Sequence, residues 1–288
     1  MRTAERPSAA HRGAHLADRL FTVMAWGCGL LGILLPASVV AFLLVDGTRA
    51  LSWRFLTDRP RGFPLGSAGG IGPAIQGSLA LVGIGLAVAL PLALGGAIWL
   101  SELRPDRRSS HLLRFLVECL AAVPSVVYGL FGYAFFVVFL RFGISLLAGG
   151  LVLAAVMFPI LLVSAQEALA AVGPEVREAA LALGVDHTYV VKRVLLRRAW
   201  AGLLAGVVLA VGHAVGSAAP ILFTATVYFR DGGLGLREPV MTLPTHLYFL
   251  VAEAISTDQA FGTALVLVLA LLVFNAAALA LRRIGAHP

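Results

Sequence analysis

Three polar side chains stand inside long apolar runs of this chain and could do chemistry there: Ser125, His213 and Ser217. An imidazole can take up or release a proton near neutral pH, and a hydroxyl can donate a hydrogen bond or act as a nucleophile. Two kinds of site are therefore possible. One is a polar path whose groups hydrogen-bond a solute, and the other is a buried pair of a nucleophile and a base. The spacing demands neither, and packing of His213 against a neighbouring helix stays open.

Pro124, Pro220 and Thr224 lie in the same apolar runs. A proline breaks the backbone hydrogen-bond ladder of a helix, so the two prolines could shape a gate or merely make packing irregular. We take these residues together with Ser125, His213 and Ser217 as the candidate lining of a substrate path.

Cofactor chemistry is not indicated by the sequence. It contains no G-x-x-x-x-G-K-[ST] loop, the device that cradles nucleotide phosphates. Cys28 and Cys119 fall in or beside apolar runs without a CxxC partner, so neither a disulfide nor a metal site is predicted. We expect no metal and no cofactor bound by this chain.

Composition places the chain among membrane proteins. Of its 288 residues, 59% are hydrophobic and 13% are charged, whereas a soluble domain carries roughly a quarter charged residues. Uncharged runs long enough to cross a bilayer must be helical, because backbone groups in lipid have to bond internally. The sequence therefore predicts an all-α membrane protein with six transmembrane helices, at about 20–45, 71–100, 119–140, 142–166, 199–229 and 259–281.

These spans predict a single transmembrane domain over 19–284, preceded by a polar tail over 1–18. If the N-terminus lies in the cytoplasm, most of the 22 Lys and Arg residues fall in segments on the cytoplasmic side. The positive-inside rule then predicts a multi-pass plasma-membrane protein with both termini in the cytoplasm. It also accounts for the net charge of +7 without nucleic acid as a partner. Seven basic residues fall on the outer side, and four of them, Arg49, Arg54, Arg59 and Arg61, lie together in the first external loop.

The polar stretch 167–198 lies between two spans and is predicted to form a helix, a turn and a second helix. Pro174 and the acidic residues that follow it suit a helix start, and Gly184 can take the positive φ that ends a helix. Asp186 can cap the second helix. A polar helix–turn–helix between two spans can serve as a docking site for a soluble partner protein. The alternative is an ordinary amphipathic connector.

This stretch resembles the signature of permease subunits of ABC importers: Glu-Ala-Ala, three residues, Gly, nine residues, then Ile-x-Leu-Pro. The chain has Glu178-Ala179-Ala180, Gly184, Val194 in place of Ile, and Leu196, with Arg197 in place of Pro. The resemblance implies a type I (MetI-like) permease whose cytoplasmic coupling helices dock on a separate ATPase. ATP and magnesium would then belong to the partner subunits.

Further segments resemble phosphate-uptake permeases. They are Gly69–Ile75, Leu100-Ser101-Glu102, Ala122–Phe131, Ala219–Ala225 and the Leu243–Tyr248 stretch. The glycine pair before Ile71 and the stretch ending at Tyr248 favour the A-type permease over its C-type sister. The resemblance implies a second related permease, a pair of ATPase subunits, an external phosphate-binding protein and membrane lipid as partners.

One segment departs from that family. Its fifth-span motif is Arg-Ala-x-Gly-Glu-Thr-Ala-Pro, and this chain has His213, Ser217 and Ala218 in place of Arg, Glu and Thr. The resemblance implies an importer permease for inorganic phosphate, with another oxyanion as the alternative substrate. An ion-coupled secondary transporter would need buried acids, which the spans nearly lack. An intramembrane enzyme would need a spacing that the sequence does not impose.

Overall fold

The longest apolar runs form helices in the computed structural model, which describes residues 9–103, 108–229 and 234–285. Within these residues, five helices are long and apolar enough to cross a membrane, and a bent pair of helices is a sixth candidate. Residues 1–8 of the predicted polar tail lie outside the described part of the chain.

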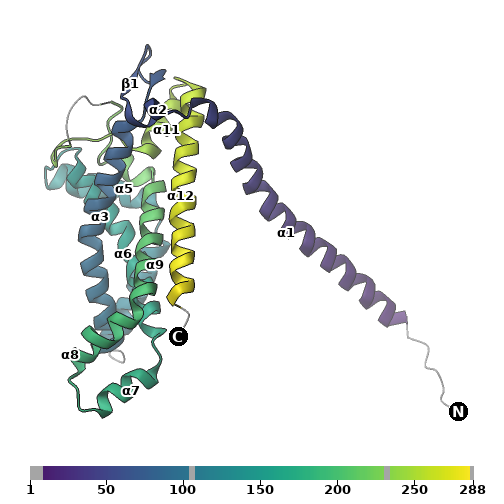
Figure 1. Cartoon of the computed structure of the whole chain (residues 1–288), viewed down its shortest axis with the longest axis vertical. Helices are drawn as coiled ribbons and strands as arrows, with labels where there is room; N and C mark the ends of the chain where they lie inside the picture. Colours follow the sequence, from purple (N-terminus) through teal and green to yellow (C-terminus); the bar gives the residue numbers. More distant parts are fainter. Residues whose placement is uncertain (1–8, 104–107, 230–233, 286–288) are drawn as a thin grey trace.

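The elements follow in chain order, with η marking wider π-type helical segments. They are α1 (Ala9–Ala50), α2 (Trp53–Thr57), β1 (Pro60–Arg61), β2 (Ala68–Gly69), α3 (Gly72–Ile98), η1 (Trp99–Leu103), α4 (Arg108–Ala122), α5 (Ser125–Gly132), η2 (Tyr133–Phe139), α6 (Leu146–Ala170), α7 (Pro174–Ala182), α8 (His187–Tyr189), η3 (Val190–Leu195), α9 (Leu196–Gly216), α10 (Ala219–Leu222), α11 (Leu243–Ala252) and α12 (Thr257–Gly285). The α7 segment projects from one end of the bundle and the antiparallel hairpin β1–β2 from the other (Figure 1). We call these the α7 end and the hairpin end.

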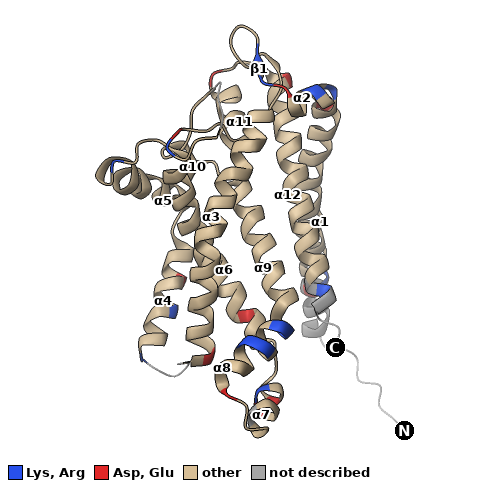
Figure 2. Cartoon of the chain, turned by 60° about the vertical axis from the view of Figure 1, so that its left-hand side comes forward, with Lys and Arg blue, Asp and Glu red and all other residues tan. Residues whose placement is uncertain are grey.

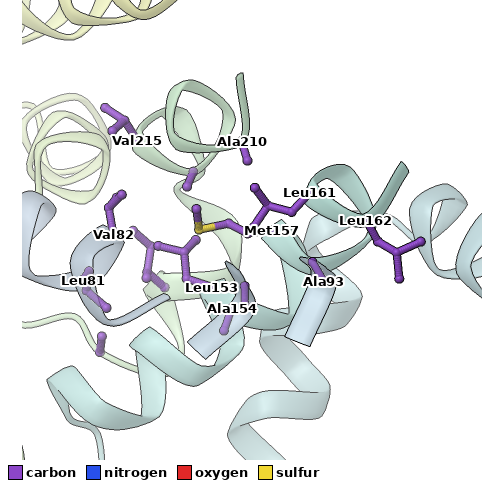
Figure 3. Packing of buried hydrophobic residues seen from close by; sticks show 14 of the residues in the cluster. Leu81, Val82, Ala93, Leu153, Ala154, Met157, Leu161, Leu162, Ala210 and Val215 are labelled. Atoms are coloured by element: carbon purple, nitrogen blue, oxygen red, sulfur yellow. The ribbon is translucent and has the colours of Figure 1, made fainter. Parts of the chain in front are cut away.

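Helices α3 and α6 form the centre of the bundle, with α9 packed against both. Small residues let them approach closely: a Cβ on Gly85 of α3 would lie 3.3 Å from the sulfur of Met157 on α6. Met157 and Leu153 are buried among apolar side chains from all three helices (Figure 3). Of the three, only α6 is buried over most of its length, and the apolar sides of α3 and α9 that the bundle leaves uncovered suit contact with lipid.

Helix α1 leans away from the bundle and meets it at the hairpin end, where it lies along α12 (Figure 1). Gly47 is buried against Leu265, and the rings of Phe42 and Phe261 meet edge to face with centroids 5.4 Å apart. Residues 18–39 are exposed, including apolar ones such as Trp26. This contact fixes one end of α1 and leaves its apolar length uncovered by the described part of the chain.

The third run differs from the single helix expected over 119–140. Helix α4 ends at Ala122, α5 begins at Ser125, and the two parts are bent by 97°. Pro124, with φ −58° and ψ 139°, stands at the start of α5, and a proline there also disfavours helical backbone at Val123. The span is therefore a broken helix whose first part begins earlier than predicted.

The fifth run also differs from the expected helix over 199–229. The helix starts upstream as α8 and η3 and ends at Gly216, so the candidate span is His187–Gly216. Ser217 has an extended backbone, with ψ 102°, and the short α10 follows before the chain becomes irregular. Basic residues near Arg197 were expected to end the span, but charges at a membrane surface do not stop a helix.

Candidate functional sites: the α7 turn and the His213 cavity

The predicted helix–turn–helix is confirmed at the α7 end. Helix α7 starts at Pro174, and Gly184 in the turn has φ +72°, the left-handed region that favours glycine. The Asp186 side chain accepts a hydrogen bond of 3.0 Å from the Thr188 N–H and so caps α8. Hydrogen bonding from Thr188 lowers the pKa of the Asp186 carboxyl below its usual value.

One side of this segment is exposed and the other is packed. Glu178, Ala179 and Gly184 are exposed, and so is Leu183 beside them. The face toward the bundle packs on a buried apolar cluster that contains Leu169, Val172, Val190, Val191 and Leu195. Small side chains next to an exposed leucine leave a surface on which a partner protein could seat closely.

The six residues taken from the coupling signature therefore divide into two groups. Glu178, Ala179 and Gly184 lie on the exposed side of the turn. Ala180, Val194 and Leu196 are half-buried and pack against the apolar cluster. The first group is placed to touch a partner, and the second group is placed to hold the turn against the bundle. We call residues 174–186 the α7 turn.

A cavity of about 530 Å³ opens between α5, α9 and α12. Ser125, His213 and Ser217 line it, and so does Asn275 of α12. The bend at Pro124 brings Ser125 to α9 although 88 residues separate it from His213. A second hollow of about 230 Å³ shares Ser125 and His213 with the first, so the imidazole stands between two cavities.

Three of the six predicted path residues thus lie together, and the other three do not line either cavity. Thr224 is fully buried and its hydroxyl donates to the Pro220 carbonyl at 2.9 Å. Pro220 is buried against Gly129, where a Cβ would lie 2.9 Å from the proline Cα. Pro124 starts α5. Pro124 and Pro220 instead influence the positions of α5 and α10 beside the cavity. Thr224 packs in the interior.

Sequence reasoning missed Asn275. It is an amide side chain within the apolar run of a long helix, which is a signal that a search for polar residues in spans could have used. Its Nδ2 donates to the Leu271 carbonyl at 2.8 Å, which holds the side chain along α12 at the rim of the cavity.

The cavity lining supplies hydrogen-bond groups and no Lys, Arg, Asp or Glu side chain. The Ser217 hydroxyl donates to the His213 carbonyl at 2.9 Å, which fixes that side chain at the end of α9. Charged residues gather toward the two ends of the bundle and leave the middle turns of α12 uncharged (Figure 2). Within the described residues, no group of three or more His, Cys, Asp or Glu is arranged to hold a metal ion.

The part of the chain that contains both sites matches a known protein family. The family described as the binding-protein-dependent transport system inner membrane component matches residues 89–285. The probable ABC transporter permease protein YqgI of Bacillus subtilis (strain 168) is 29% identical over 278 residues, covering 91% of this chain and 94% of that protein. The probable phosphate transport system permease protein PstA of Methanocaldococcus jannaschii is 30% identical over 258 residues, covering 88% and 89%.

Among solved structures, the inward-facing MetNI methionine ABC transporter superposes with a TM-score of 0.59 at 17% identity, covering 75% of this chain and 94% of the matched chain. That likeness establishes the fold and confirms the MetI-like, all-α membrane architecture. The α7 turn and the His213 cavity both lie within the matched residues 89–285. The chain belongs to the family of binding-protein-dependent transport system inner membrane components, as a PstA-like, multi-pass permease subunit of an ABC importer.

Proposed function

We propose that this permease carries inorganic phosphate inward, as the A-type subunit of its importer. The observation that carries the proposal is one polar cavity beside a broken helix, in a chain whose relatives include phosphate transport permeases. A solute released at the hairpin end would reach the cavity along α5 and α10. This direction follows from placing the α7 turn in the cytoplasm.

The α7 turn is the proposed docking site for the ATPase. Glu178, Ala179 and Gly184 would touch the ATPase, while Ala180, Val194 and Leu196 would transmit its movement to the bundle. The turn's exposed outer side and packed inner side support this assignment. The remaining partners would be a second permease, a second ATPase subunit, an external phosphate-binding protein and lipid.

The placement in the membrane is also part of the proposal. The basic residues around Lys192, Arg193, Arg197 and Arg198 belong on the cytoplasmic side by the positive-inside rule. The N-terminal end of α1 and the C-terminal end of α12 point in the direction of the α7 end (Figure 1), which supports both termini in the cytoplasm. Residues 19–284 would then form one transmembrane domain.

The proposed path is lined by Ser125, His213 and Ser217. Imidazole and hydroxyl groups can hydrogen-bond the oxygens of an oxyanion, and a fixed positive charge would have to come from the second permease. Because His213 and Ser217 replace a charged pair of the phosphate permeases, another oxyanion is the second candidate substrate.

Uptake of radiolabelled phosphate tests the substrate. A host without its own phosphate importers receives this chain with its partner subunits, and sulfate, molybdate and arsenate are added as competitors. We expect energy-dependent phosphate uptake that arsenate, the closest phosphate analogue, inhibits best. Uptake of sulfate or molybdate with no phosphate uptake would replace phosphate by the other oxyanion. A matched strain that carries the partner subunits without this chain provides the background.

A further inference from the structure

Arg177 of α7 ties together three elements that are distant in the sequence. Its Nε and Nη2 donate to the two carboxylate oxygens of Glu102 in η1, at 3.1 and 2.7 Å. Its Nη2 also donates to the Leu169 carbonyl at 2.9 Å, and its Nη1 donates to the Val172 carbonyl at 2.9 Å. One guanidinium therefore joins α7, the inner end of α3 through η1, and the end of α6.

The surroundings make this contact strong and directional. The Glu102 side chain is 3% exposed and the Arg177 side chain is 27% exposed, so water competes little for the carboxylate. A two-pronged guanidinium–carboxylate pair fixes relative orientation as well as distance. The last carbonyls of a helix have no partner inside it and attract a cation. Arg177 thus also caps α6, and Lys could not make the same set of bonds.

A second guanidinium holds the same segment from the other side. Arg114 of α4 donates from Nη2 to the Leu100 carbonyl in η1 at 3.0 Å. Segment η1 is accordingly fixed to α4 by Arg114 and to α7 by Arg177. Wide helical turns of this type often lie at functional positions because they loosen the regular backbone ladder.

We propose that the Arg177–Glu102 pair is the positioning contact that carries movement of the α7 turn into α3 and α6. This inference rests on the proposed docking of an ATPase at the α7 turn. Arg177 stands directly before Glu178 of the exposed side, so a displacement of that side moves the guanidinium with it. With the pair intact, α3 follows α7 together with α6. With the pair broken, α7 can tilt while α3 stays behind, because the remaining bonds of Arg177 reach only the carbonyls at the end of α6.

The test compares variants of the full importer complex in proteoliposomes. Glu102→Gln keeps the shape of the side chain and removes its charge, and Arg177→Lys keeps the charge and removes the forked geometry. Asp46→Asn is the matched control, since it removes the ion pair of 3.6 Å between Asp46 and the largely exposed Arg49 on α1. Three quantities are measured for each: ATPase subunits retained on purification, ATP hydrolysed, and solute imported per ATP.

We expect Glu102→Gln to retain its ATPase subunits and to import about tenfold less solute per ATP, a size usual for coupling between distant sites. Arg177→Lys should fall between Glu102→Gln and wild type, and Asp46→Asn should match wild type. A wild-type ratio of solute to ATP in both Glu102→Gln and Arg177→Lys overturns the inference. So does loss of the ATPase subunits in either variant, because the pair would then serve docking. A wild-type complex that retains no ATPase overturns the proposed function itself.

Discussion

His213 gives the cavity its character, because it is the one ionisable side chain in the lining and it faces two hollows at once. Its neighbours Ser125 and Ser217 come from α5 and from the end of α9, so the three side chains meet through the bend at Pro124. Sequence analysis found these residues because polar groups are rare in apolar spans. It could not find that Asn275 lines the same cavity, since that depends on how α12 packs.

Replacing His213 with Ala is expected to reduce phosphate uptake about tenfold to 150-fold, the range for losing one hydrogen bond to a charged group. The ring lines the cavity, and the methyl group of alanine cannot donate a hydrogen bond. Initial rates of uptake between pH 5 and 8 measure the effect. Thr224→Ser is the control, because it keeps the hydroxyl that is bonded to Pro220. Unchanged uptake in His213→Ala across this pH range would return His213 to a packing role.

His246 predicts how stability depends on pH. It lies in α11, which is too short to be counted as a span, is 2% exposed, and has no hydrogen-bond partner at Nδ1. Burial lowers the pKa of this imidazole from 6.5 to about 4. Between pH 6.5 and about 4, the unfolded chain therefore binds a proton at His246 while the folded chain does not. Stability should be complete above pH 6.5 and fall toward pH 4, by at most about 1.4 kcal/mol per pH unit.

The thermal midpoint of the purified protein in detergent, measured from pH 7.5 down to 4.5, checks this expectation. His246→Leu removes the titrating group at similar volume, so its midpoint should fall less than that of the wild type over the same range. Equal falls in both proteins would assign the pH dependence to other groups.

At the scale of elements, the α7 turn depends on the backbone of Gly184. A Cβ on Gly184 would meet nothing within 4 Å, so the restriction comes from its φ of +72°. Gly184→Val is expected to strain the turn by about 1–2 kcal/mol, the cost of left-handed backbone for such a residue. Gly184→Asn tolerates that conformation better and serves as the control.

For Gly184→Val we expect the chain to insert normally while ATPase retention and uptake fall together. Glu178→Lys should have the same two effects through reversal of an exposed charge. Copurification of the ATPase and uptake in the same cells measure both. Normal uptake in Gly184→Val and in Glu178→Lys would remove the docking role from the α7 turn.

The bend between α4 and α5 is fixed by close packing as well as by Pro124. A Cβ on Gly129 would lie 2.9 Å from the Ala219 carbonyl oxygen and 2.9 Å from the Pro220 Cα. Gly129→Ala should therefore push α5 away from α10, at about 1–3 kcal/mol for overpacking. Gly83→Ala in α3 has open space and should leave uptake unchanged. Thermal midpoints and uptake rates of the two variants decide, and a Gly129→Ala protein as stable and active as Gly83→Ala would contradict this packing.

Helices were predictable wherever apolar length alone determined them, and their interruptions were not. Helix α6 was expected over 142–166, four residues earlier at each end than observed, because Arg141 and the polar residues after Gln166 bound a long uncharged run. The bend at Pro124 was not expected, since a proline in an apolar run may either kink a span or break it. The 97° bend between α4 and α5 shows that the span is broken, and the close approach of Gly129 to Pro220 helps to hold that bend.

At the scale of the whole molecule, the two candidate sites lie at different places along the bundle. The α7 turn lies at one end, the His213 cavity is bounded by α5, α9 and α12, and α3 and α6 form the packed centre. Arg177 and Glu102 connect the turn to that centre. Sequence analysis missed this connection because 75 residues separate the partners and nothing local pairs them. The exposed length of α1 is a further property of the fold that apolar periodicity alone does not reveal.

Solute uptake into proteoliposomes, with and without the ATPase subunits, tests the central claim most directly. The permease pair alone, and the full complex without ATP, should import no phosphate, because the α7 turn would then receive no movement. The full complex with ATP and the external binding protein should import it steadily. Import at full rate by the permeases alone would contradict the account.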